Sequence, residues 1–134
     1  MRTVCVSVAL LSLLLPERGL HASELMELTL SCDGKTTNMM ADSDTKPESV
    51  TKMGVLVNLR EGTVLGFGHT ARIKSSDAAS VDFGGEGSDW SVQGTIDRIT
   101  GSVEATTMLM NQNTNKLIMS YSWDLHCNPV KRVF

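Results

Sequence analysis

Apolar and polar residues alternate along most of the chain after residue 25. The longest run is close to the C-terminus, where six residues of one phase are apolar: Leu117, Met119, Tyr121, Trp123, Leu125 and Cys127. Similar runs cover 26–32, 53–59, 79–83 and 90–96, with Leu56 as the one exception. Successive side chains of a strand point to opposite faces, so a period of two predicts half-buried strands. Since no window beyond residue 22 has a convincing helical period, we predict an all-β domain.

Turn residues divide these runs into hairpins. One turn lies at 60–62, one at 99–101 and one at 111–116. A three-residue loop at 60–62 would place Leu59 opposite Thr63, point Leu65 and Phe67 inward and put Gly62 in the left-handed position. We therefore expect a single long strand over 63–74, bent at its glycines.

The segment from Asp33 to Ser49 is rich in turn-forming residues and is expected to be a mobile loop, with a short helical turn starting near Pro47. This gives about seven strands. A meander of seven would bring Cys32 and Cys127, each ending a strand, to the same rim. An eighth strand over 36–40 is the alternative, and it would require the first strand to run past Cys32. Both versions describe a small antiparallel meander barrel or rolled sandwich.

The N-terminus has the order of a secretory signal peptide: Arg2, an uncharged run over 4–15, and the small residue Ala22. The apolar run is too short for a membrane helix, which needs about 20 residues. We predict cleavage between Ala22 and Ser23, a single domain over 23–134 without a transmembrane segment, and a periplasmic or secreted location.

Removal of the signal takes away Cys5 and leaves Cys32 and Cys127, for which one pairing exists. Oxidising compartments favour such a bond. Closing a loop of this length contributes about 4 to 5 kcal/mol in the chain-entropy model. A zinc–thiolate site would need further ligands at suitable spacing, and none is evident. We predict a disulfide.

The formal net charge is −3, and removal of 1–22 increases the acidic excess. Without a stripe of Lys or Arg, the chain lacks the electrostatic footprint of a nucleic-acid or anionic-membrane binder. We expect no nucleic-acid partner.

Catalytic motifs are absent from the mature sequence. Its two histidines, His69 and His126, belong to no recognisable local motif. Four carboxylates cluster along the chain: Asp77, Asp82, Glu86 and Asp89. The glycine-rich segment 84–87 lacks the Lys-Ser/Thr of a phosphate loop. We therefore expect no enzyme activity and no cofactor.

Methionines suggest one alternative, a Cu(I) carrier, because thioethers are soft ligands. Met108 and Met110 share a strand face opposite in phase to the apolar residues around them, and His69 or the pair Met39-Met40 could complete a site. Methionine also fills gaps in cores without any metal. We favour that explanation and assign no metal site.

Two motifs carry a resemblance. The segment Gly94-Thr95-Ile96-Asp97-Arg98-Ile99-Thr100-Gly101 and the opening 28–34 resemble small secreted bacterial proteins of unknown function. This implies an exported β domain with no established activity. A weaker likeness, through Cys32-Asp33-Gly34 and the late cysteine, is to periplasmic inhibitors of c-type lysozyme, which are eight-stranded barrels. The chain lacks their Ser-Gly-x-x-Tyr motif, so no inhibitory residue is transferred.

These observations predict an exported, non-enzymatic binding or envelope-associated module whose partner is a protein or an envelope component. The alternatives are an inhibitor of a cell-wall hydrolase and a Cu(I) carrier. Trp90 and Trp123 lie in the apolar phase of their runs, so we expect both to be buried.

Overall fold

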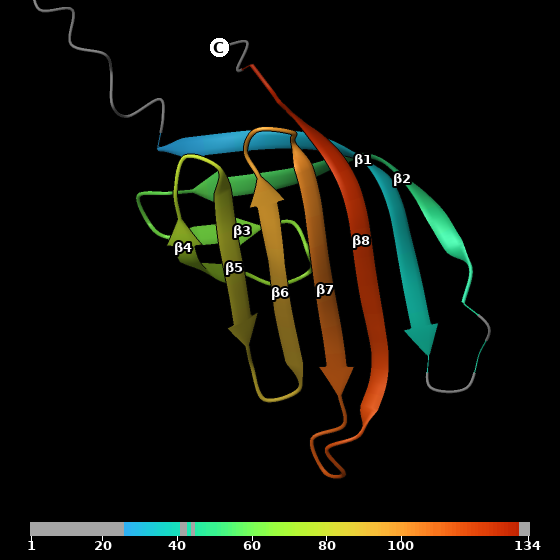
Figure 1. Cartoon of the computed structure of the whole chain (residues 1–134). Coiled ribbons are helices and arrows are strands. Elements are labelled where there is room, and N and C mark those ends of the chain that lie inside the picture. The colour runs from blue at the N-terminus through green and yellow to red at the C-terminus, as the bar shows by residue number, and fades with distance from the viewer. Residues whose placement is uncertain (1–25, 41–42, 44, 132–134) are drawn as a thin grey trace, which may run out of the picture.

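The computed structural model describes residues 26–40, 43 and 45–131, which form a closed antiparallel barrel (Figure 1). Each strand pairs with the next in sequence, and the last returns to pair with the first. The strands are β1 (Glu27–Met40), β2 (Pro47–Asn58), β3 (Thr63–Leu65), β4 (Ala71–Ser76), β5 (Ser80–Glu86), β6 (Trp90–Asp97), β7 (Ser102–Met110) and β8 (Leu117–Pro129). The prediction of an all-β meander barrel is confirmed, with eight strands. The predicted signal peptide and its cleavage site at Ala22 and Ser23 lie outside the described residues and stay a prediction.

The barrel interior is filled by one phase of each alternating run. Buried apolar side chains come from all eight strands and one loop: Leu30, Cys32, Val55, Val57, Val64, Phe67, Ala71, Val81, Phe83, Val92, Ile96, Val103, Ala105, Leu125 and Cys127. Burial of this much apolar surface is the main favourable term in folding. The period of two therefore identified the inner face correctly on β1, β2, β5, β6 and β8.

The predicted disulfide joins Cys32 to Cys127, which face each other across the β1–β8 pair. It fastens the first strand to the last, at a sequence separation of 95. The expectation that both cysteines end their strands is wrong for Cys32, because β1 continues to Met40. Most of the predicted loop over 33–49 is therefore strand, and Pro47 begins β2 rather than a helical turn.

The expected loop was misread because β1 changes register there. Its pairing with β2 shifts between Cys32 and Gly34, and the N–H of Lys52 donates to Asp33 Oδ1 within this bulge. Gly34 passes so close to the backbone of Asp124 that a Cβ would collide with it. A bulge of this kind bends the strand and breaks the simple alternation.

The eighth strand comes from a break in the segment that we expected to be continuous. Gly66 (φ 142°) and Gly68 (φ 83°) take conformations that favour glycine, and β3 ends at Leu65. The hairpin also has one more loop residue than predicted, since Asn58 rather than Leu59 faces Thr63. Gly62 does occupy the left-handed region, as expected. As a result Leu65 points outward, while Phe67 is buried.

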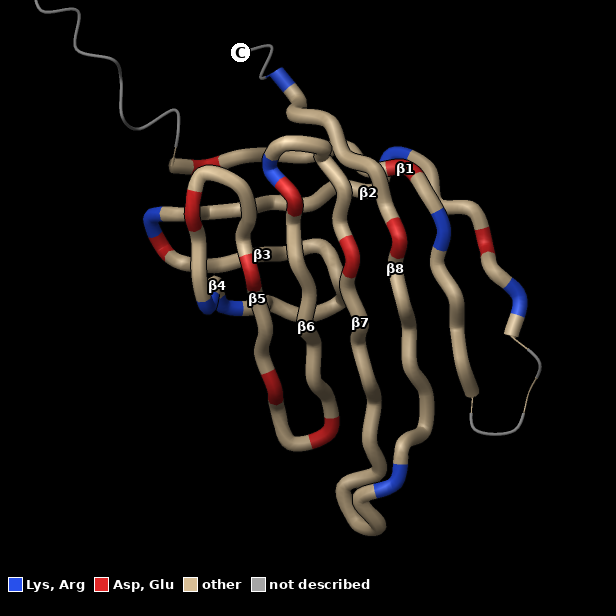
Figure 2. The backbone as a smooth tube through the Cα atoms, viewed as in Figure 1, with Lys and Arg blue, Asp and Glu red and all other residues tan. Residues whose placement is uncertain are grey.

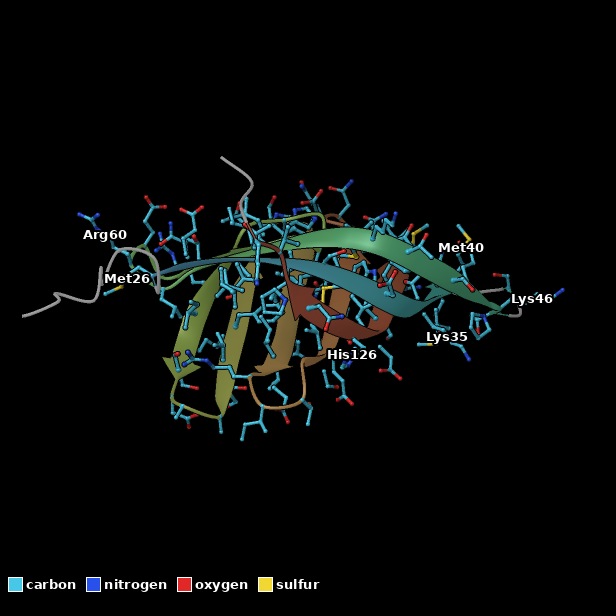
Figure 3. All side chains as sticks on the ribbon, turned by 90° about the horizontal axis from the view of Figure 1, so that it is seen from above. Met26, Lys35, Met40, Lys46, Arg60 and His126 are labelled. Atoms are coloured by element: carbon cyan, nitrogen blue, oxygen red, sulfur yellow. A yellow bond between two sulfur atoms is a disulfide. The ribbon has the colours of Figure 1, made fainter. Side chains whose placement is uncertain are left out.

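The barrel has two unlike ends. At one end, the turn end, lie the β4–β5 and β6–β7 turns and the start of β1 (Figure 1). At the other, the mouth end, strands β5 to β8 extend beyond the short strands β3 and β4 (Figure 1). Viewed from above, Met26 and Met40 mark the opposite ends of β1 (Figure 3).

Candidate functional site

The loop between β3 and β4, residues 66–70, folds into the barrel near the mouth end. The Thr107 hydroxyl donates a buried hydrogen bond of 3.1 Å to the carbonyl of Phe67. The Phe67 ring stacks on Phe83, with 5.4 Å between centroids, and meets the edge of Trp123 at 5.3 Å. These contacts fix the loop against the inner faces of β5, β7 and β8.

Further aromatic rings continue the inner surface toward the mouth. His69 stacks on Trp90 with 4.0 Å between ring centroids and 1° between planes. Tyr121 stacks on Trp123 at 5.8 Å. Both tryptophans are only half-buried, so the prediction of buried tryptophans holds for their inward direction and not for full enclosure.

A small, partly open cavity of about 160 Å³ lies among the rings of the inner face. Its lining is Phe67, Gly68, His69, Thr107, Leu109, Tyr121 and Trp123. An apolar cavity of about 150 Å³ is large enough to hold one benzene ring. The mouth therefore has room for a single aromatic ring or one apolar side chain of similar size.

Two polar atoms on the inner face of β1 lack partners within the described residues. Thr36 Oγ1 and Asn38 Oδ1 are buried, and neither has a hydrogen-bond partner within the described part of the chain. Thr36 faces Trp123 and Asn38 faces Tyr121 across the β1–β8 pair, so all four side chains share the inner face. A buried polar group without a partner costs about 1 to 3 kcal/mol. Such groups are rare in native proteins, and each calls for an explanation.

A second hollow lies on the outer face of the sheet. This groove, of about 660 Å³, is crossed by a row of polar residues that pair strand to strand: Asp82, Thr95, Glu104, Asp124 and Lys35. Figure 2 shows the carboxylates of this row on β5, β7 and β8. Hydrogen bonds from Thr95 and then Ser75 lower the pKa of Asp82, so this carboxylate stays ionised and is unsuited to act as a general acid.

The four carboxylates that cluster in the sequence lie in separate parts of the structure. Asp77 accepts hydrogen bonds from the N–H groups of Ser80 and Ala79, which lower its pKa. Asp82 lies on the outer face, and Glu86 and Asp89 flank the β5–β6 turn. No group of three or more His, Cys, Asp or Glu residues suitable for a metal ion occurs among the described residues.

The residues weighed as alternative copper ligands are also separated. Met108 and Met110 belong to the outer face of β7, whereas His69 stacks on Trp90 on the inner side. Met39 and Met40 are part of β1, opposite Ser120 and Met119, and not of a mobile loop. His126 is exposed on the outer face of β8 (Figure 3).

The motif over 94–101 forms the end of β6 and the β6–β7 turn rather than a site. Asp97 accepts hydrogen bonds from the N–H groups of Thr100 and Ile99, which lower its pKa. Gly101 has φ 77°, and its carbonyl accepts the N–H of Cys127. The motif thus ties the β6–β7 turn to the disulfide strand.

The sequence did not single out Phe67, Tyr121, Thr36 or Asn38 as site residues. The available signal was the segment Gly66-Phe67-Gly68-His69, in which glycines on both sides of an aromatic residue mark a loop able to enter the barrel. Placing Thr36 and Asn38 beside the rings required knowing that β1 extends to Met40.

In comparisons with known proteins, no family model matches the chain, and neither a curated protein nor a solved structure matches it significantly. Across the described ranges, no helix has the length and hydropathy needed to cross a membrane.

Proposed function

We propose that this protein is an exported, non-enzymatic binding module whose mouth holds one aromatic ring bearing an N–H or O–H donor. The observation that carries the proposal is the combination found at the mouth. A cavity of single-ring size lies between aromatic walls, and the unpartnered oxygens of Thr36 and Asn38 belong to β1 residues that face Trp123 and Tyr121 on the same inner face.

Each part of the mouth has a role in this proposal. Offset or edge-to-face contacts with Phe67, Tyr121 and Trp123 would favour a flat ring. The Asn38 carboxamide oxygen is an acceptor, and the Thr36 hydroxyl can accept or donate. A donor on the ring would satisfy groups that are otherwise buried at a cost.

Binding rather than catalysis is supported by the titratable groups. Asp77, Asp82 and Asp97 are all held toward their ionised forms by hydrogen bonds, and all three lie away from the mouth. The predicted signal peptide supports export, with which the disulfide is compatible.

The proposal is tested with two probes of nearly equal shape, p-cresol and toluene, of which only p-cresol has a donor. We expect p-cresol to bind with a dissociation constant of about 1 mM, which corresponds to a binding free energy of about −4.1 kcal/mol. We expect p-cresol to bind about tenfold more tightly than toluene, since satisfying one buried group is worth about 1.4 kcal/mol. Titration of tryptophan fluorescence, with binding checked by ligand-observed NMR, measures both affinities.

In a variant that combines Thr36→Val with Asn38→Leu, the affinities for p-cresol and toluene should differ by no more than about twofold, because both acceptor oxygens are removed. Thr95→Val, a change of the same type on the outer face, should leave both affinities as they were. No binding of either probe, or equal binding of both to the unaltered protein, would contradict the proposal.

A second proposal is inhibition of a cell-wall hydrolase. It is favoured by one observation, an eight-stranded barrel whose first and last strands are joined by the bridge Cys32–Cys127, as the likeness to lysozyme inhibitors implies. An equimolar mixture with c-type lysozyme, assayed on cell-wall substrate, tests it. Unchanged lysozyme activity at tenfold excess of this protein would remove it.

A further inference from the structure

Of the residues that the structure places around the cavity, His69 alone has a side chain that can carry a positive charge. It belongs to the β3–β4 loop, and its imidazole lies flat on the indole of Trp90, with 1° between the two planes. Among the described residues, the imidazole has this stacking contact and neither a hydrogen bond nor an ion pair. The half-buried ring therefore keeps both nitrogens available to a ligand or to solvent.

The indole that supports His69 is itself held by the β5–β6 turn. Gly87 packs so closely against Trp90 that a Cβ at this position would collide with the indole. The N–H of Gly87 also donates to the Trp90 carbonyl. A ring that is already fixed loses little further freedom when a ligand binds, so His69 forms a pre-organised part of the cavity wall. The face of a tryptophan also attracts a cation, which favours a protonated imidazole in this place.

His69 and the unpartnered oxygens lie on opposite flanks of the cavity. Thr36 and Asn38 belong to β1, whereas Trp90, on which His69 stacks, begins β6. The strands between them are β8 and β7, which both contribute residues to the cavity lining. A ring between the two flanks would therefore meet acceptor oxygens on one side and the imidazole on the other.

No carboxylate lines the cavity within the described part of the chain. The other titratable groups near His69 and on the strands that surround it are Tyr121 in the cavity wall, Glu86 and Asp89 exposed at the β5–β6 turn, Glu104, Asp124 and His126 on the outer face, and Asp97 at the turn end. Exposed charges are screened by solvent and salt. Of these groups, only the histidines are of a type that ordinarily changes charge between pH 5 and 8.

We infer that the mouth selects a phenolic acid, a single ring with a hydroxyl donor at one end and a carboxylate at the other, and that His69 is the residue that recognises the carboxylate. The inference rests on the ring site proposed above. The hydroxyl donates to the oxygens of Thr36 and Asn38, and the carboxylate accepts from the imidazole. A charge-assisted hydrogen bond is about twice as strong as a neutral one, so binding is tightest when the imidazole is protonated.

The closing experiment compares p-cresol with 4-hydroxyphenylacetate, which adds a carboxylate to the same phenol. Both are titrated at about pH 5.5 and about pH 8, where a carboxylate is ionised and a phenol is neutral. We expect 4-hydroxyphenylacetate to bind about tenfold more tightly at the lower pH, because a histidine is protonated mainly there and gains a charge-assisted hydrogen bond. The affinity for p-cresol should be equal at the two pH values.

Two matched variants identify the group responsible. His69→Phe keeps an aromatic ring against Trp90 and removes both nitrogens, so the ratio of the two affinities should no longer depend on pH. His126→Phe makes the same change at the exposed histidine of the outer face and should keep the pH dependence of the unaltered protein. Binding of p-cresol by each variant also shows that it is folded. In the unaltered protein, the imidazole proton signals of His69 should shift when 4-hydroxyphenylacetate binds, and those of His126 should not.

The outcomes separate the two proposals. If p-cresol binds but 4-hydroxyphenylacetate binds no more tightly at the lower pH, the role of His69 is refuted and the ring site stands. A pH dependence that persists in the His69→Phe variant, or imidazole signals of His69 that do not shift, would assign the carboxylate to another group and overturn the inference. If neither ligand binds at either pH, the ring site fails and the inference fails with it.

Discussion

The two ends of the barrel differ in whether their polar groups have hydrogen-bond partners. At the turn end, Asp97 and Asp77 accept backbone N–H groups, and the carbonyl of Gly101 accepts the N–H of Cys127. At the mouth end, Thr36 and Asn38 keep buried oxygens without partners in the described structure. The hydrogen-bonded polar groups of the turn end stabilise the fold, whereas the unpartnered groups of the mouth end are typical of a binding site.

The largest change in stability is expected from removing the Cys32–Cys127 disulfide. Cys32→Ser with Cys127→Ser removes a link between the first and last strands and should lower the free energy of unfolding by about 2 to 5 kcal/mol. Urea unfolding of both proteins measures the loss. A midpoint equal to that of the oxidised protein would show that the bridge is dispensable.

A smaller loss is expected from Gly101→Ala. Gly101 has φ 77°, and a Cβ would collide with the Cys127 carbonyl, so the strained backbone should cost about 1 to 3 kcal/mol. Gly54→Ala is the control, since nothing lies within 4 Å of a Cβ built there. Equal unfolding midpoints for the two variants would remove the special role of the β6–β7 turn.

At the mouth, removing unpartnered polar groups should stabilise the protein, whereas removing a polar group that has a partner should destabilise it. Thr36→Val with Asn38→Leu removes unpartnered groups and should raise the free energy of unfolding by up to about 1 kcal/mol. Thr107→Val removes a real hydrogen bond to Phe67 and should lower it by about 1 kcal/mol. Thermal and urea unfolding of both variants check the signs, and a loss of stability in the Thr36 and Asn38 variant would mean that partners exist.

The smallest expected effect is on how stability depends on pH in the acid range. The pKa of Asp97 is lowered by its turn hydrogen bonds, so its folded value lies below the ordinary 3.8. A group of this kind adds stability above its unfolded pKa, and the contribution is lost as pH falls through the folded pKa. Unfolding midpoints should therefore decline below about pH 4. Asp97→Asn should show a shallower decline, and an equally steep one would contradict the assignment.

The sequence predicts the inner face because alternation is a local property. The runs containing Val55, Val81, Val92 and Leu125 each place those residues in the core, as the structure confirms. The disulfide also followed from the sequence, since only two cysteines remain after the predicted cleavage. The strand count stayed open between seven and eight because of a possible extra strand over 36–40, which the structure instead makes part of β1. The eighth strand comes from the break at Gly66 and Gly68, which the sequence analysis expected only to bend a continuous strand.

The mouth could not be predicted in the same way. Thr36 and Asn38 fall in a segment whose alternation is broken by the bulge at Gly34. Their neighbours Tyr121 and Trp123 are more than eighty positions away in the chain, and only the closure of β1 onto β8 brings them together. Met108 and Met110 on β7 were visible in the sequence, but their half-buried setting depends on the pairing of β7 with β8.

The most direct test of the difference between the mouth end and the turn end is a map of amide and indole chemical shifts during titration with p-cresol. The account predicts changes at residues 67–69, at Thr107 to Leu109, at Tyr121 to Trp123 and at the indole N–H groups of both tryptophans. Residues 97–101 of the turn end should not move. Shifts centred on the turn end, or along the outer groove between Asp82 and Lys35, would contradict the assignment of the mouth as the binding site.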